Sequence, residues 1–141
     1  MSEPGSGGLA RVVDPLLGTV VGGRFLLEAR IGSGSIGTVY RARHLLIGRA
    51  VAIKVMSLPP SHRERYRAWF LREARAVNRV NHCHVAEIYD VGETPDGAVF
   101  LVMELLEGDR LSDRLRAGPV RQELALSILE QATAALGRAH D

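Results

Sequence analysis

A glycine-rich stretch near the N-terminus constrains the fold of this chain most strongly. The glycines are Gly32, Gly34 and Gly37, and Val39 and Tyr40 follow them at once. Glycines at this spacing let the backbone turn tightly and bring its N–H groups close to a polyanion. The dinucleotide-binding form of such a turn leads into a helix, whereas Val39 and Tyr40 favour a strand. The order of residues therefore predicts a hairpin flap that folds over phosphates.

Lys54 is the second constraint. It is the only lysine in the chain, and it lies within the apolar stretch Val51–Val55, which predicts a strand. A cation inside such a strand is costly unless it is paired. A compact ammonium on a flexible stem suits contact with phosphate oxygens where a planar guanidinium does not. We therefore predict Lys54 to be a phosphate ligand; a strand-end lysine that reaches into solvent is the alternative.

The rest of the apolar pattern predicts a small antiparallel sheet with one long helix. Pro59 and Pro60 end the third strand because proline cannot continue a ladder, and Ser61 with Glu64 predicts a capping box at the start of the helix. The expected strands are 24–31, 39–46, 49–56, 85–91 and 98–103, with a turn at 94–97, and the expected helix runs from 61 to about 80.

That helix carries a carboxylate on its apolar face. Phe70, Glu73 and Val77 share this face, so Glu73 needs a cationic partner. Lys54 across the sheet is the partner that we predict, and a surface pair with neighbouring arginines is the alternative. Rotation of the helix would break the pair with Lys54, so the pair predicts an element with two states.

Gly32-x-Gly34-x-x-Gly37-x-Val39 followed by Val51-Ala52-Ile53-Lys54 resembles the opening of a protein kinase domain. The likeness is to bacterial Ser/Thr protein kinases of the eukaryotic type. It implies an α+β fold: a kinase-like N-lobe, with a five-stranded antiparallel sheet and one regulatory helix, followed by two helices of an incomplete C-lobe. Residues 15–108 would form the N-lobe and hinge, and 109–141 the partial C-lobe. Residues 1–14, rich in Gly, Ser and Pro, predict a disordered tail.

The resemblance also implies a nucleotide site. The glycine loop would cover the phosphates of ATP, Lys54 would contact the α- and β-phosphates, and Glu73 would hold the lysine. The hinge would hydrogen-bond the adenine edge through the backbone of Glu104 and Leu106. For each apolar member of the site, plain core packing is the alternative. The implied nucleotide contacts are Ile31, Gly32, Ser33, Gly34, Ser35, Ile36, Gly37, Thr38, Val39, Ala52, Lys54, Met103, Glu104 and Leu106.

The likeness extends from about residue 24 to 140 and covers only the first half of the family's domain. The catalytic His-Arg-Asp loop with its Asn and the magnesium-binding Asp-Phe-Gly motif do not occur, and His140-Asp141 has no arginine between its members. ATP and magnesium are the cofactors that the resemblance implies, but the magnesium ligands are not in this chain. We therefore expect no phosphoryl transfer from this chain alone.

Composition disfavours several other classes of protein. A net charge of +2 with dispersed arginines gives no basis for nucleic-acid or membrane partners. No apolar run approaches the roughly 20 residues of a membrane helix and no secretory signal is present, so we expect a cytoplasmic protein. Cys83 is the single cysteine, and its cluster with His82 and His84 lacks a further ligand at standard spacing, so no metal site is predicted.

Three interpretations stay open at this point. The chain is the ATP-binding portion of a Ser/Thr protein kinase, or a non-catalytic kinase-like nucleotide-binding or regulatory module, or a small α+β interaction domain with an incidental glycine turn. The expected partners are ATP and either a protein substrate or the missing lobe. The helix expected at 121–140 carries an apolar stripe that the rest of a kinase lobe would cover, so self-association through this helix is a further expectation.

Overall fold

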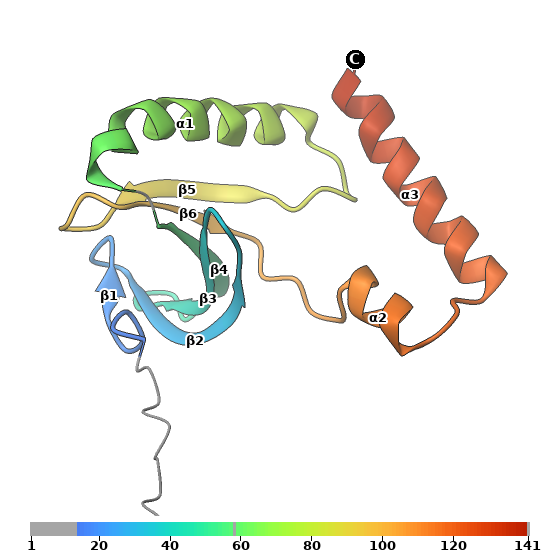
Figure 1. The fold of residues 1–141 in the computed structure, drawn as a ribbon, viewed down its shortest axis with the longest axis horizontal. Helices are drawn as coiled ribbons and strands as arrows, with labels where there is room; N and C mark the ends of the chain where they lie inside the picture. The colour runs from blue at the N-terminus through green and yellow to red at the C-terminus, as the bar shows by residue number, and fades with distance from the viewer. Residues whose placement is uncertain (1–13, 58, 141) are drawn as a thin grey trace, which may run out of the picture.

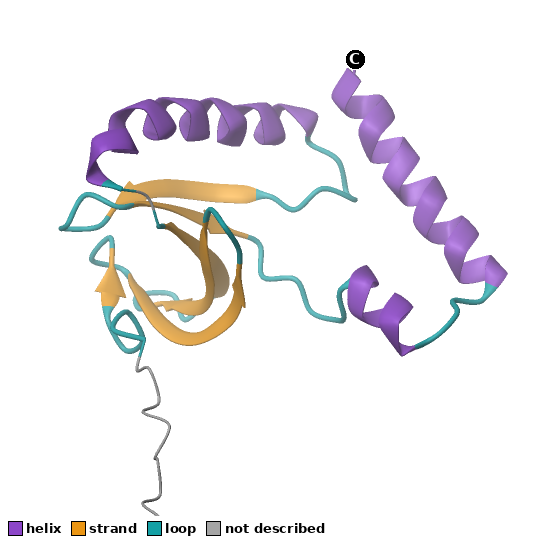
Figure 2. Ribbon diagram, in the orientation of Figure 1, coloured by secondary structure: helices purple, strands orange, loops and turns teal. Residues whose placement is uncertain are grey.

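The computed structural model describes residues 14–57 and 59–140, without the side chain of Pro60. In this part of the chain, one curled antiparallel sheet has the strand order β1-β2-β3-β4-β6-β5, and three α-helices accompany it (Figures 1 and 2). The elements are β1 (Val20–Val21), β2 (Phe25–Ser33), β3 (Gly37–His44), β4 (Ala50–Met56), α1 (Arg63–Val80), β5 (Ile88–Glu93), β6 (Val99–Met103), α2 (Leu111–Ala117) and α3 (Gln122–His140).

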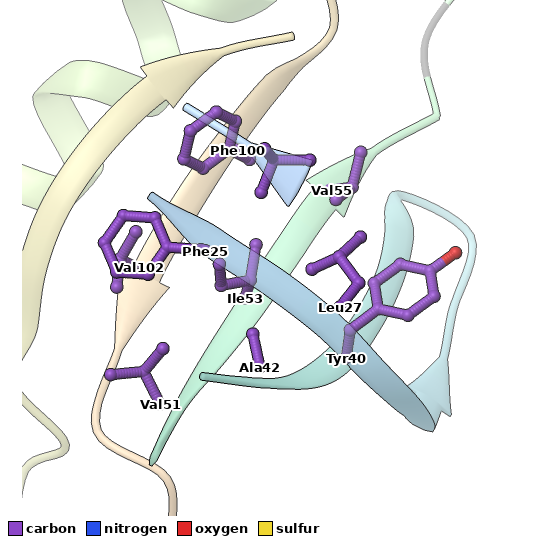
Figure 3. Packing of buried hydrophobic residues seen from close by; sticks show 10 residues of the cluster. Phe25, Leu27, Tyr40, Ala42, Val51, Ile53, Val55, Phe100 and Val102 are labelled. Carbon is purple, nitrogen blue, oxygen red and sulfur yellow. The ribbon is translucent and has the colours of Figure 1, made fainter. Parts of the chain in front are cut away.

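The sheet encloses an apolar core on its concave side, as Figure 3 shows. Leu27, Ala42 and Ile53, from β2, β3 and β4, are all fully buried there. Successive side chains of a strand point to opposite faces, so Val51 and Val55 join Ile53 in this core. The residues between them on β4 face the other side of the sheet.

Helix α1 covers that other side. Phe70 and Ala74 of α1 are buried against Met56 of β4 and Leu101 of β6 in a second apolar cluster. Lys54 is two residues from Met56 and lies opposite Leu101 in the β4–β6 ladder. Lys54 therefore stands on the face of the sheet that α1 covers.

The segment before the first long strand is tied to the sheet by Tyr40. The Tyr40 hydroxyl donates to Asp14 Oδ2 at 2.8 Å. Burial of the ring, and then this hydrogen bond, raise the pKa of Tyr40 to about 12. The phenol is therefore neutral at ordinary pH and keeps its role as a donor.

The predicted α+β architecture of a sheet with one covering helix and two further helices is confirmed. The sheet has six strands rather than five, because Val20 and Val21 pair with Leu26 and Phe25 to form a short edge strand. The predicted capping box is wrong. A 3-10 turn (Pro60–His62) precedes α1, and the N-cap His62 makes no side-chain cap, since its ring contacts Ser61 Oγ at 3.0 Å instead.

Helices α2 and α3 extend away from the sheet (Figure 1). Neither contains a buried residue. Helix α3 contacts α1, and Leu124, Ile128 and Ala135 of the predicted stripe are half-buried. Within the described residues, no helix combines the length and apolarity needed to cross a bilayer. The predicted tail falls almost wholly on residues 1–13, outside the described part of the chain.

Ile53→Ala is expected to lower the free energy of unfolding by about 2–5 kcal/mol, because it leaves a cavity in a closely packed core. Leu46→Ala is the matched control. Leu46 is 83% exposed whereas Ile53 is 0% exposed, so the control should change the stability by less than about 0.5 kcal/mol. Urea titration followed by circular dichroism measures both, and equal losses would contradict the assignment of the core.

Candidate nucleotide-binding site

The glycine stretch forms the connection of a β-hairpin. Strand β2 ends at Ser33 and β3 begins at Gly37. Across the turn the Gly34 N–H donates to the Gly37 carbonyl at 2.9 Å, and Ser33 lies opposite Thr38 in the ladder. No helix follows the glycines, so the predicted flap is confirmed as a strand–turn–strand element.

The two ends of this glycine hairpin differ in how firmly they are held. A Cβ atom at Gly37 would lie 2.3 Å from the Val55 carbonyl oxygen, whereas one at Gly34 would meet nothing within 4 Å. The Ile36 carbonyl also accepts from the Ser57 N–H at 3.1 Å. The β3 side of the hairpin is therefore packed against the end of β4, and the tip at Gly34 is open.

A cavity of about 280 Å³ lies beneath this hairpin. Its walls are the glycines, serines and isoleucine of the hairpin, two cationic side chains and one valine, with no carboxylate among them. Lys54 reaches it because Val39, in the strand that leaves the hairpin, pairs directly with Lys54. The complete lining is Gly32, Ser33, Gly34, Ser35, Ile36, Gly37, Val39, Lys54 and Arg110.

A larger cavity of about 770 Å³ adjoins the first on the side of the segment that follows β6, residues 104–110. Val39 and Arg110 line both cavities, so the two form one continuous cleft. The volume of the larger cavity alone lies within the range of small-molecule sites, roughly 300–1,000 Å³. The other lining residues are Ile31, Arg41, Leu105, Leu106, Glu107, Gly108 and Asp109.

Hydrogen bonds hold the start of the segment after β6, whereas backbone groups further along it have no backbone partner. The Glu104 N–H donates to the Glu87 carbonyl at 2.9 Å, and the Glu104 carboxylate accepts from the Glu87 N–H at 3.4 Å. The Glu104 carbonyl and both backbone groups of Leu106 have no backbone partner among the described hydrogen bonds. The resemblance to protein kinases implies that these groups hydrogen-bond the edge of adenine, and no backbone hydrogen bond in the structure competes for them.

The structure brings most of the predicted site residues together around the cleft. The exceptions are Thr38, Ala52, Met103, Glu104 and Glu73, which line neither cavity. Ala52 and Met103 lie opposite each other in the β4–β6 ladder, where Ala52 is buried and Met103 half-buried.

The ion pair between Lys54 and Glu73 is not formed in this structure. No ion pair within 4.0 Å in the described part of the chain includes either residue. Phe70 and Ala74 make the contact face of α1, and Glu73 is turned away from it and exposed. The surface pair with neighbouring arginines is also not formed. The predicted pair between Lys54 and Glu73 is therefore absent from this arrangement, and the two-state element stays a prediction.

Sequence reasoning missed the contacts that hold α1 in this orientation. The Asn78 side chain donates to the Ile88 carbonyl at 2.9 Å and accepts from the Ile88 N–H at 3.2 Å. At the other end of α1, Arg67 pairs with Glu93 at 3.6 Å. These polar side chains sit on a mostly exposed helix face, and nothing in their spacing distinguishes them from solvated residues. Arg110 was also missed, because nothing in the sequence around it distinguishes it from a solvated arginine.

The sequence profile of the protein kinase domain matches residues 25–141. The chain belongs to the protein kinase family. It is 36% identical over 128 residues to the serine/threonine-protein kinase pkn3 of Myxococcus xanthus, and 34% identical over 126 residues to the serine/threonine-protein kinase PrkC of Bacillus subtilis. These matches cover 90% and 89% of this chain. The likeness to bacterial Ser/Thr kinases is thereby confirmed.

Solved kinase structures give the same result for the fold. The kinase domain of Mycobacterium tuberculosis PknI superposes with a TM-score of 0.70 at 26% identity, over 87% of this chain and 51% of that one. The chain spans about a fifth of the length of the two curated relatives, 23% and 19%. It therefore corresponds to the N-terminal part of a kinase domain rather than to a whole one.

Gly37→Ala is expected to lower the free energy of unfolding by about 1–3 kcal/mol, because the added methyl group would force β3 away from the Val55 carbonyl. Amide hydrogen exchange at Ser57 should accelerate in this variant, since its acceptor is Ile36. Gly34→Ala is the matched control and should leave the Ser57 exchange rate unchanged. The account of the hairpin fails if the two variants exchange at the same rate.

Proposed function

We propose that this chain is the ATP-binding portion of a Ser/Thr protein kinase domain, which in the longer family members transfers the γ-phosphoryl group of ATP to a protein hydroxyl. The observation that carries the proposal is the position of Lys54. Its side chain leaves the α1 face of β4 and lines the cavity beneath the glycine hairpin. A cation at this place complements a polyphosphate that the backbone N–H groups of the hairpin also bind.

The cleft has a suitable place for each part of ATP. The phosphates would lie beneath the glycine hairpin, with Lys54 on the α- and β-phosphates. The adenine would lie in the larger cavity, between Ile31 and Val39 on one side and Leu106 on the other. The Glu104 carbonyl and the Leu106 backbone would hydrogen-bond the edge of the base. The larger cavity combines the apolar side chains of Ile31, Val39 and Leu106 with charged residues around them, and apolar walls with a few polar groups are usual for such pockets.

The residues of this chain alone do not supply the ligands that magnesium requires. The cavity beneath the hairpin has no carboxylate in its lining, and the described residues contain no group of three or more His, Cys, Asp or Glu side chains that could hold a metal ion. Mg²⁺ requires oxygen ligands, usually from carboxylates. We therefore assign this chain a role in binding the nucleotide and no step that proceeds through the metal.

Glu73 is proposed to secure Lys54 only after α1 moves. Glu73 is exposed in the present arrangement, and bringing it to Lys54 requires α1 to turn about its axis. Such a turn would break the contacts of Asn78 with Ile88 and of Arg67 with Glu93. Surface ion pairs contribute little stability each, so the larger cost of the turn is the repacking of Phe70 and Ala74 in the apolar cluster beneath α1.

The non-catalytic alternative shares the same cleft, and the lack of a carboxylate in the lining of the phosphate cavity is expected under both hypotheses. Under that alternative the chain binds ATP and serves as a regulatory module. Both hypotheses predict nucleotide binding, and they differ in whether transfer follows when the rest of a kinase domain is present.

ATP binding is expected to be weak, on the order of millimolar, because about half of a kinase domain contributes to the site. Lys54→Met should weaken ATP binding by about tenfold or more, since it removes a charged contact with the phosphates. Arg138→Met is the matched control: it removes one positive charge from the exposed end of α3. Titration calorimetry measures both variants, and equal affinities would reject the proposal.

Self-association through α3 is the second proposal about partners. Leu126, Leu129 and Leu136 are 53–60% exposed and lie on one side of the helix by their spacing. Leu126 and Leu129 lie outside the stripe that the sequence predicts, whose Leu124, Ile128 and Ala135 are half-buried. The three exposed leucines form a separate apolar stripe, and such a stripe favours association with a second copy of the chain.

Leu129→Glu is expected to shift the chain toward the monomer in sedimentation velocity, because it places a charge in the centre of the stripe. Glu130→Gln, at the neighbouring exposed position, is the control and should leave the distribution unchanged. A wild-type chain that remains monomeric at all concentrations would contradict the proposal.

A further inference from the structure

Arg110 links the two walls of the cleft. It immediately precedes α2, and its Nη2 donates to the Ile31 carbonyl at 3.2 Å, across 79 positions of the sequence. Gly32 makes room for this contact, because a Cβ atom there would lie 2.5 Å from Arg110 Nη2. The guanidinium therefore lies at the root of the glycine hairpin, where the two cavities meet.

Glu107 and Asp109 line the larger cavity together with Arg110, but neither forms an ion pair with it. No ion pair within 4.0 Å in the described part of the chain includes it, whereas Arg114 on the same helix pairs with Asp109 at 3.7 Å. A guanidinium carries five N–H donors, and the Ile31 carbonyl uses one of them. The remaining donors are available to a ligand in the cleft.

The cavity beneath the hairpin therefore presents two cations and no anion. Lys54 and Arg110 line it together with Val39 and the hairpin residues from Gly32 to Gly37. The chemistry that complements this lining is a polyanion with several oxygens. A guanidinium binds phosphate oxygens with two parallel hydrogen bonds, while an ammonium acts as a point charge, so the two side chains are suited to different oxygens of one phosphate chain.

We propose that Arg110 is a second phosphate-binding cation of the nucleotide site, which gives up its bond to the Ile31 carbonyl when a polyphosphate enters. This proposal rests on the proposed function, because it assigns a further residue to the same ligand. The bond that is given up is a weak one: it is long for an N–H···O contact, and its acceptor is exposed. Arg110 thus contributes to the preference for the triphosphate over the bare nucleoside.

The test compares three probes: ATP, adenosine and inorganic tripolyphosphate. Arg110→Ala is expected to weaken binding of ATP and of tripolyphosphate by about tenfold, the loss typical of a charge-assisted hydrogen bond, and to leave adenosine affinity unchanged. Arg116→Ala is the matched control, because it removes the same charge from α2, and neither Arg116 nor its ion-pair partner Asp113 lines either cavity. It should bind all three probes as the wild type does. Circular dichroism establishes that both variants keep the fold.

The outcomes separate the two proposals. If the wild type binds ATP and Arg110→Ala binds it equally well, the role of Arg110 is rejected and the proposed function stands. Equal weakening of ATP and adenosine would make Arg110 a structural tie between hinge and hairpin, which also rejects its role as a phosphate ligand. If the wild type binds neither ATP nor tripolyphosphate, both the proposed function and the role of Arg110 are rejected.

Discussion

The alternation of side chains along β4 is the constraint on which the rest of the structure depends. Ile53 is fully buried in the concave core, and the ladder fixes Lys54 opposite Val39 on one side and Leu101 on the other. A shift of one residue would send the ammonium into the apolar core and expose Ile53. The burial of Ile53 thus determines the face on which Lys54 stands, and the cleft forms around that lysine.

Much of this arrangement follows from the sequence, because it depends on local patterns. The glycine spacing and the strand residues after it predict the hairpin, and a single lysine in an apolar strand marks the phosphate side. The short strand β1 was not predicted, since two valines carry no periodicity. The cap of α1 was mispredicted because Ser61 falls in a 3-10 turn rather than at the helix start. The preferences of individual residues predict the exact first and last residues of a helix poorly.

The features that the sequence could not supply are those that join distant segments. Arg110 reaches Ile31 only because the chain after β6 folds back beside the hairpin, and no spacing within the sequence encodes that contact. Glu73 is the opposite case, because the sequence predicts a contact that the structure does not contain. Its position on the helix predicts a partner, but the rotation of α1 decides whether the carboxylate reaches it. In the present arrangement Glu73 is exposed, while Asn78 and Arg67 of the same helix contact β5.

The central claim is that the Lys54 ammonium faces a phosphate site beneath the glycine hairpin. Lys54 is the only lysine of the chain, so labelling with ¹³Cε-lysine gives a single side-chain resonance in an NMR spectrum. Addition of ATP is predicted to shift this resonance in a saturable manner, while adenosine at the same concentration shifts it far less. A resonance that stays in place while backbone signals of residues 32–37 respond to ATP would contradict the claim.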